Sequence, residues 1–189
     1  MMNLLLVESN RHSDALMLAL QQTAIHVHKT AYSLSLPTLI KEAEPDIILF
    51  NLGVLNESVL QDLAWLNQHF PLPVIMLIAD ADQDVIQQLM ALEVSLLQVN
   101  CLEYAELQSW LQIAVARFKQ LQHLKNALEE AKAQLEDRKQ IDRAKAILIK
   151  TQHYTEHEAY HTLRKLAMDR NSTLSEMAKN VIAMAELLK

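Results

Sequence analysis

EPDIILFNLGV, residues 44–54, contains an apolar run that predicts a strand over Asp46–Phe50. The apolar residues are consecutive and do not alternate with polar ones, which is typical of a strand covered on both faces. Two further runs, Asn3–Val7 and Val74–Ile78, have the same character. The segment therefore predicts a central strand in a sheet that has helices on both sides.

Segments with helical spacing alternate with these strands along the first 120 residues. The expected strands are Asn3–Val7, Ala24–His28, Asp46–Phe50, Val74–Ile78 and Ser95–Val99. The expected helices are Ser13–Gln22, Leu36–Ala43, Ser58–Phe70, Asp82–Leu92 and a long one from about Tyr104. Five strands alternating with five helices predict an α/β domain, a five-stranded doubly wound parallel sheet, over residues 1–119.

Composition narrows the class of protein. One cysteine, Cys101, excludes an internal disulfide framework, and no apolar run is long enough to span a bilayer. The start, MMNLLLVESN, has no basic region and no cleavage site, so it favours a strand over a signal peptide. We therefore expect a cytoplasmic protein. Residues 1–119 hold 5 Lys and Arg against 13 Asp and Glu, whereas residues 120–189 hold 12 against 10.

In parallel sheets of this kind the working site lies at the carboxyl ends of the strands. Five residues follow or end the strands there: Glu8, Ser9, Asn51, Ile78 and Asn100. The layout resembles a response-regulator receiver domain, which has two acids, a phospho-accepting Asp, a Ser or Thr and a Lys at these places. Only Glu8 keeps the expected type. An amide at Asn51 cannot form an acyl phosphate, and one carboxylate is a poor Mg²⁺ site. We expect a pseudo-receiver that serves as a docking surface.

A leucine pattern follows in the long helix, where apolar positions are spaced alternately by three and four residues. The pattern includes Leu121, Leu124, Leu128 and Leu135, and it predicts a seam along which two chains pair. The alternative is a single helix packed on its own domain. We expect a homodimer, with residues 120–135 as a coiled-coil linker helix.

After Leu135 the apolar phase changes, and Ile141, Ala144, Leu148 and Ile149 form a new stripe. Two capping boxes, Thr155 with Glu158 and Thr173 with Glu176, predict the starts of two more helices. The next helix should direct Ala159, Tyr160, Leu163, Leu166 and Ala167 toward a core, and the last should bury Leu174, Met177, Ala178, Val181, Ile182, Ala185 and Leu188. Residues 136–189 should thus form an all-α three-helix bundle.

This tail resembles the ANTAR family of transcription antitermination regulators. The stretches that carry the resemblance are RKQIDRAKAILIK (138–150), EHEAYHTLRKLAMDRNSTLSEMA (156–178) and NVIAMAELL (180–188). Family positions are met by Ala144-Lys145, by Ala159-Tyr160 with Leu163-Arg164, and by Ala167-Met168 with Asn171. Ala146 departs from the pattern, where glycine is usual. The ending IAMAELL is most similar to the nitrate-assimilation branch.

The resemblance implies binding of RNA, not catalysis and not a cofactor. The expected target is a leader mRNA with two stem-loops, whose binding prevents a terminator hairpin and affects RNA polymerase only indirectly. The expected RNA-binding residues are Arg138, Lys139, Arg143, Lys145, Tyr160, Arg164, Lys165, Arg170 and Asn171. Cations can follow phosphates, and Tyr160 can stack on an exposed base. The branch also implies control by a cytoplasmic nitrate-sensing regulatory protein.

Other interpretations remain open at this point. The cations can be a solvated face and Tyr160 a core residue, in which case the tail is a protein–protein adaptor that binds no RNA. Binding of DNA is less favoured, because the tail has no recognisable helix-turn-helix register. His153, His157 and His161 recur every four residues, but no acid or cysteine completes a metal site in register. We expect no metal.

Overall fold

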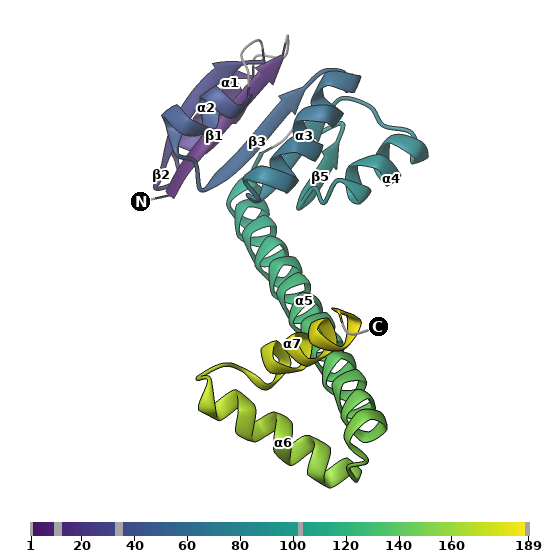
Figure 1. The fold of residues 1–189 in the computed structure, drawn as a ribbon. Helices are drawn as coiled ribbons and strands as arrows, with labels where there is room; N and C mark the ends of the chain where they lie inside the picture. Colours follow the sequence, from purple (N-terminus) through teal and green to yellow (C-terminus); the bar gives the residue numbers. More distant parts are fainter. Residues whose placement is uncertain (1, 10–12, 33–35, 102–103, 188–189) are drawn as a thin grey trace. The chain divides into compact units, whose positions relative to one another are not determined.

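The computed structural model describes residues 2–9, 13–32, 36–101 and 104–187, and it divides into two compact units, Met1–Gln122 and His123–Lys189. The first unit alternates strands and helices as expected (Figure 1). Its elements are β1 (Met2–Ser9), α1 (Asp14–Gln21), β2 (Ile25–Ala31), α2 (Leu36–Ala43), β3 (Ile47–Leu52), α3 (Glu57–His69), β4 (Val74–Ile78), α4 (Gln83–Ala91), β5 (Leu96–Val99) and the first part of α5 (Leu107–Gln152).

All neighbouring strands pair in parallel, in the order β2-β1-β3-β4-β5. The predicted doubly wound sheet is therefore confirmed. The largest difference among the strand boundaries is at β2, which ends at Ala31, three residues beyond the expected His28. Pairing with β1 continues as far as Glu8 opposite Ala31, so the ladder carries the polar residues Lys29 and Thr30 into the sheet. A strand at the edge of a sheet tolerates such residues because one side faces water.

Each face of the sheet has its own core, because successive side chains of a strand point to opposite faces. Leu5 and Val7 of β1 pack with residues of α2, α3 and α4, whereas Leu4 and Leu6 pack with α1 and the start of α5. All six residues of β3 are buried. The apolar run within residues 44–54 thus forms the middle strand of a sheet that lies between two helical layers.

The second unit consists of the remainder of α5, α6 (Glu156–Asp169) and α7 (Leu174–Leu187). Ala144, Leu163, Ala167, Met177, Ala178 and Ile182 form its core. Both predicted capping boxes are present: Thr155 with Glu158 begins α6, and Thr173 with Glu176 precedes α7. The α5 helix is a single element of 46 residues, so the predicted linker and the first helix of the bundle are continuous.

Two predictions about this core were wrong, and one lies outside the described residues. Ile149 is 38% exposed, and Ile147 packs against the core in its place. Tyr160 is 42% exposed and is not a core residue. Both residues lie just past the edge of a buried helical stripe, where the direction of the neighbouring helices decides burial. Leu188, expected in the core, is outside the described part of the chain.

Turns in this chain must use residues other than glycine, since Gly53 is the only one. Glu44, Glu93, Asn100, His153 and Asn171 adopt a left-handed backbone, with φ between 41° and 60°. His153 lies between α5 and α6, outside both helices, so the three histidines do not share one helical face. In the described residues, no helix combines the length and apolarity needed to cross a membrane.

Candidate functional site

Glu8 and Asn51 lie side by side near the carboxyl ends of β1 and β3, where they are paired in register. Both side chains are buried, with 1% and 0% exposure. The Asn51 side-chain nitrogen donates to Glu8 Oε1 at 3.1 Å, and Lys29 Nζ lies 2.8 Å from Glu8 Oε2. Lys29 comes from β2, one strand away. The arrangement is a buried carboxylate held between an amide and an ammonium group.

This arrangement does not fit a magnesium ion, which the receiver resemblance would imply. Mg²⁺ requires several hard oxygen ligands. Here a nitrogen of Asn51 faces one oxygen of Glu8, and the Lys29 ammonium faces the other. The Lys29 ammonium beside the Glu8 carboxylate supplies positive charge at the place where a cation would bind. The charge of the Glu8 carboxylate is therefore balanced by a lysine of the chain itself.

The other three residues expected at this site do not join the pair. Ser9 ends β1 and lies opposite Leu52. Ile78 is buried in the core on the α2–α3–α4 side of the sheet. Asn100 is exposed in a left-handed turn, and its backbone nitrogen donates to the carbonyl of Ile78.

Lys29 was missed by sequence reasoning, although a signal for it exists. Ile25, Val27 and Lys29 share one face of β2 because side chains of a strand alternate. A lysine that follows two partly buried apolar residues on the same face indicates a charge directed inward. Its partner could be named only from the β1–β2 register.

The exposed face of α6 gathers residues suited to nucleic acid. Ala159, Leu163 and Ala167 bury one side of this helix. Tyr160, Arg164 and Lys165 are exposed on the opposite side of the helix. His157 and His161 are exposed on this side as well. Helical spacing of three and four residues places these five side chains on one surface. We call this surface, defined by His157, Tyr160, His161, Arg164 and Lys165, the α6 face.

Arg170 and Asn171 extend the polar surface beyond the end of α6. Arg170 is the C-cap residue, and Asn171 follows it with φ 50°. The backbone nitrogen of Ser172 then donates to the carbonyl of Ala167. Such a left-handed residue closes a helix end, and asparagine tolerates this conformation better than most residues. Both side chains are exposed.

Three of the four predicted cations of α5, namely Lys139, Arg143 and Lys145, are engaged in ion pairs, and the fourth, Arg138, is exposed. Arg143 lies 2.8 Å from Glu186, and Lys139 lies 4.0 Å from Glu136. Lys145 has only 17% exposure and lies 2.8 Å from Asp142 and 2.9 Å from Glu156.

These contacts raise the pKa of Lys145, first through the bond to Asp142 and then through the bond to Glu156. The same ammonium lowers the pKa of the Asp142 carboxyl. Because Glu156 begins α6, Lys145 joins α5 to α6. It is thereby less available to a ligand than the cations of the α6 face.

The leucine pattern of α5 is exposed in the single chain. Leu124, Leu128 and Leu135 are 58%, 55% and 55% exposed, and Leu121 is partly buried. Apolar side chains at this spacing remain to be covered by another surface. Pairing of two chains along this seam stays a prediction.

Comparison with known proteins identifies the helical unit. The family described as "ANTAR domain" matches residues 129–182. The chain is 38% identical over 68 residues to the "Nitrate regulatory protein" of Klebsiella oxytoca, a match that covers 36% of this chain and 17% of that protein. It is 22% identical over 139 residues to the "Transcriptional regulatory protein PdtaR" of Mycobacterium tuberculosis (strain CDC 1551 / Oshkosh), covering 74% of this chain and 68% of that protein.

A solved structure supports the fold of the first unit. The signal receiver domain of a modulated diguanylate cyclase from Desulfovibrio desulfuricans G20 matches with a TM-score of 0.52 and 17% sequence identity. The match covers 62% of this chain and 96% of that domain. At this level of identity the likeness concerns the fold alone, and it agrees with the five-stranded parallel sheet.

Proposed function

Because this chain belongs to the regulators that join a receiver-like domain to an ANTAR domain, we propose that it is an RNA-binding transcription antiterminator. It binds paired hairpins in a leader transcript and thereby prevents termination. In this proposal residues 1–119 are a pseudo-receiver, residues 120–135 a linker helix and residues 136–189 the RNA-binding domain. The genes that it regulates are those of nitrate or nitrite assimilation, in keeping with the similarity to a nitrate regulatory protein.

The observation that carries the proposal is the α6 face. Recognition of RNA loops relies on aromatic and guanidinium planes for stacking and on cations for phosphates. Tyr160, Arg164 and Lys165 supply these groups on one exposed surface, and Arg170 and Asn171 follow at its end. Among the described residues, none of these three cations is engaged in an ion pair.

Control comes from a partner protein and not from phosphorylation. Asn51 stands where a receiver carries its acceptor, and Lys29 already neutralises Glu8. The acidic first domain suits a protein partner, and we propose a cytoplasmic nitrate-sensing protein. Acetyl phosphate or beryllofluoride with Mg²⁺ should change neither the mass nor the oligomeric state, and stable incorporation of one phosphate would refute this point.

The functional form is a homodimer that pairs along Leu121, Leu124, Leu128 and Leu135. Leu124→Glu combined with Leu128→Glu should give a monomer in sedimentation, because charges in an apolar seam oppose pairing. A double variant that remains dimeric would indicate that the dimer interface lies in the receiver-like domain.

Filter binding tests the function directly. The free protein should bind a leader RNA with two hairpins in the absence of an activating ligand, and bind a matched DNA duplex far more weakly. Tighter binding of the DNA duplex would favour a DNA-binding protein, and equal binding of both would contradict specific recognition of the hairpins.

The second candidate is a protein–protein adaptor whose tail binds no RNA. The ion pairs of Lys139, Arg143 and Lys145 favour it, because they reduce the positive charge that α5 presents. Failure to bind either nucleic acid, with the fold intact, would leave this candidate in place.

A further inference from the structure

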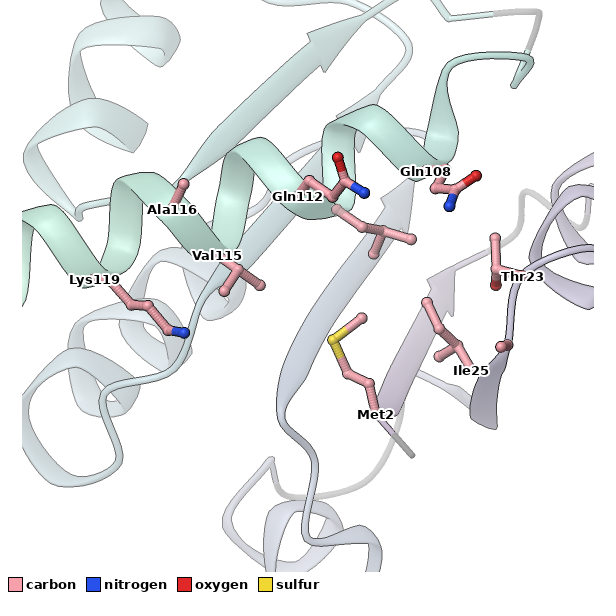
Figure 2. Close-up of a pocket in the computed structure, with 10 residues that line it drawn as sticks. Met2, Thr23, Ile25, Gln108, Gln112, Val115, Ala116 and Lys119 are labelled. Carbon is pink, nitrogen blue, oxygen red and sulfur yellow. The ribbon is translucent and has the colours of Figure 1, made fainter.

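A groove lies where β1 and β2 begin, against the first turns of α5 (Figure 2). Its volume is about 530 Å³, and all of its lining belongs to the first unit. Met2 and Ile25, opposite each other in the β1–β2 register, form one wall, and their side chains point toward α5. Leu111 and Val115 of α5 form the other wall. Volumes of about 300–1,000 Å³ are typical of small-molecule sites.

The apolar walls of this groove are only partly covered by the protein itself. Met2, Ile25 and Val115 pack against the core on the α1–α5 side, yet each remains partly exposed. The α1 helix ends at Gln21 and packs on this core through its own Leu16 and Leu20, whereas Met2 and Ile25, at the beginnings of the strands, remain partly exposed. An apolar molecule in the groove would remove these side chains from water, which is favourable in proportion to the area buried.

One end of the groove carries a positive charge. Lys119 lines it, and its side chain extends toward Met2 (Figure 2). In the part of the chain that the structure describes, no acidic side chain pairs with Lys119. This differs from Lys29, whose ammonium faces Glu8. Residues 1–119 are strongly acidic, with 5 cations against 13 acids, so an unpaired lysine beside an apolar groove is a distinctive feature.

From this combination we propose that the groove binds a small amphipathic acid, a molecule with an apolar chain or ring and one carboxylate. The apolar part lies between Met2, Ile25, Leu111 and Val115, and the carboxylate pairs with Lys119. The inference goes beyond RNA binding, because the groove belongs to the first unit and the α6 face to the second. Failure of one proposal therefore leaves the other unaffected.

Methyl NMR of the full chain labelled with ¹³C-methyl methionine tests the proposal, with dodecanoate as the probe. The Met2 signal, assigned with Met2→Leu, should shift in a saturable manner as dodecanoate is added. Met168, which is 72% exposed and lies outside the groove, serves as the reference signal and should stay in place. A Met2 signal that does not move overturns the proposal, and it would direct the search to a partner helix as the occupant.

Three variants separate the parts of the site. Ala116→Trp, on the exposed rim of the groove, should abolish the shift by filling the space. Lys119→Gln should weaken binding of dodecanoate about fivefold, as expected for an exposed ion pair, and leave binding of the neutral dodecan-1-ol unchanged. Arg117→Gln, on the same helix but outside the groove, is the matched control and should change neither affinity. Equal loss of acid and alcohol with Lys119→Gln, or normal binding by Ala116→Trp, would contradict the proposal.

Discussion

The two ends of this chain hold their ionisable groups in opposite ways. At the strand ends, Glu8 is fully buried and has its oxygens occupied by Asn51 and Lys29. On the α6 face, Arg164 and Lys165 are exposed, and within the described residues neither is engaged in an ion pair. A charge that is buried and paired stabilises one structure, whereas an exposed unpaired charge is free to bind. The Glu8 carboxylate at the strand ends is thus held by groups of the chain itself, whereas the cations of the α6 face remain available to a ligand.

Removal of Lys29 should have the largest effect on stability. Lys29→Met removes the ammonium group that faces the buried Glu8 carboxylate, which should lower the free energy of unfolding by about 2 kcal/mol. This is less than for a fully buried pair, because the Lys29 side chain is 38% exposed. Urea unfolding measures the loss.

Two further variants sharpen this test. Glu8→Gln should cost less than Lys29→Met, since the lysine it leaves behind can reach water. Lys132→Met, which breaks an exposed pair with Glu129, should cost less than about 0.5 kcal/mol. Equal losses for Lys29→Met and Lys132→Met would mean that the strand-end site is not a buried ion pair in energetic terms.

The next largest effect should be on the affinity of the protein for RNA. Arg164→Ala and Arg170→Ala should each weaken binding of a two-hairpin RNA about tenfold, because a guanidinium that contacts a base or phosphate is lost. Filter binding at several salt concentrations measures the affinity together with the salt slope, which is the slope of log affinity against log salt concentration. Arg117→Ala, in the first unit, is the control and should leave both unchanged. If both tail variants bind with normal affinity and salt slope, the adaptor function is favoured.

The sequence predicted some parts of this comparison and not others. Unbroken apolar runs such as Asp46–Phe50 indicated the sheet, because burial on both faces leaves a pattern that depends only on local sequence. Lys29 was not predicted as the partner of Glu8, since their contact depends on which strands are neighbours and on their register. Ile149 and Tyr160 were misplaced for a similar reason: the packing of α6 and α7 decides which side of a helical stripe is covered.

Replacement of Lys145 should have a smaller effect on stability, and it distinguishes a residue that positions α6 from one that contacts a phosphate. Lys145→Ala removes the contacts to Asp142 and Glu156, so thermal unfolding should show a loss of about 1 kcal/mol, reduced by the exposure of both acids. If Lys145 acts by positioning α6, the variant should bind RNA more weakly while the salt slope stays unchanged. A slope reduced by about one would instead identify a direct phosphate contact. Lys139→Ala, at an exposed α5 pair, is the control for stability.

The smallest effect is expected at the two capping glutamates, and it appears only in acid. The pKa of Glu158 and of Glu176 lies below the ordinary value of 4.5. The main cause is a hydrogen bond from the backbone of Thr155 and Thr173, respectively, and the second is a hydrogen bond from the side chain of the same threonine. Because the pKa is lowered in the folded protein, the charged carboxylate stabilises the helix fully at a pH above the ordinary pKa. This stabilisation is lost as the pH falls through the lowered pKa.

The variants that test this effect carry glutamine, whose side chain can also accept the capping hydrogen bond but does not titrate. The double variant Glu158→Gln with Glu176→Gln should therefore be slightly less stable than the natural chain at neutral pH. The difference should shrink as the pH falls below about 4.5, as measured by urea unfolding of residues 123–189 within the full chain through the Tyr154 and Tyr160 signals. A difference that is independent of pH would show that these carboxylates stabilise the helix starts through packing and not through charge.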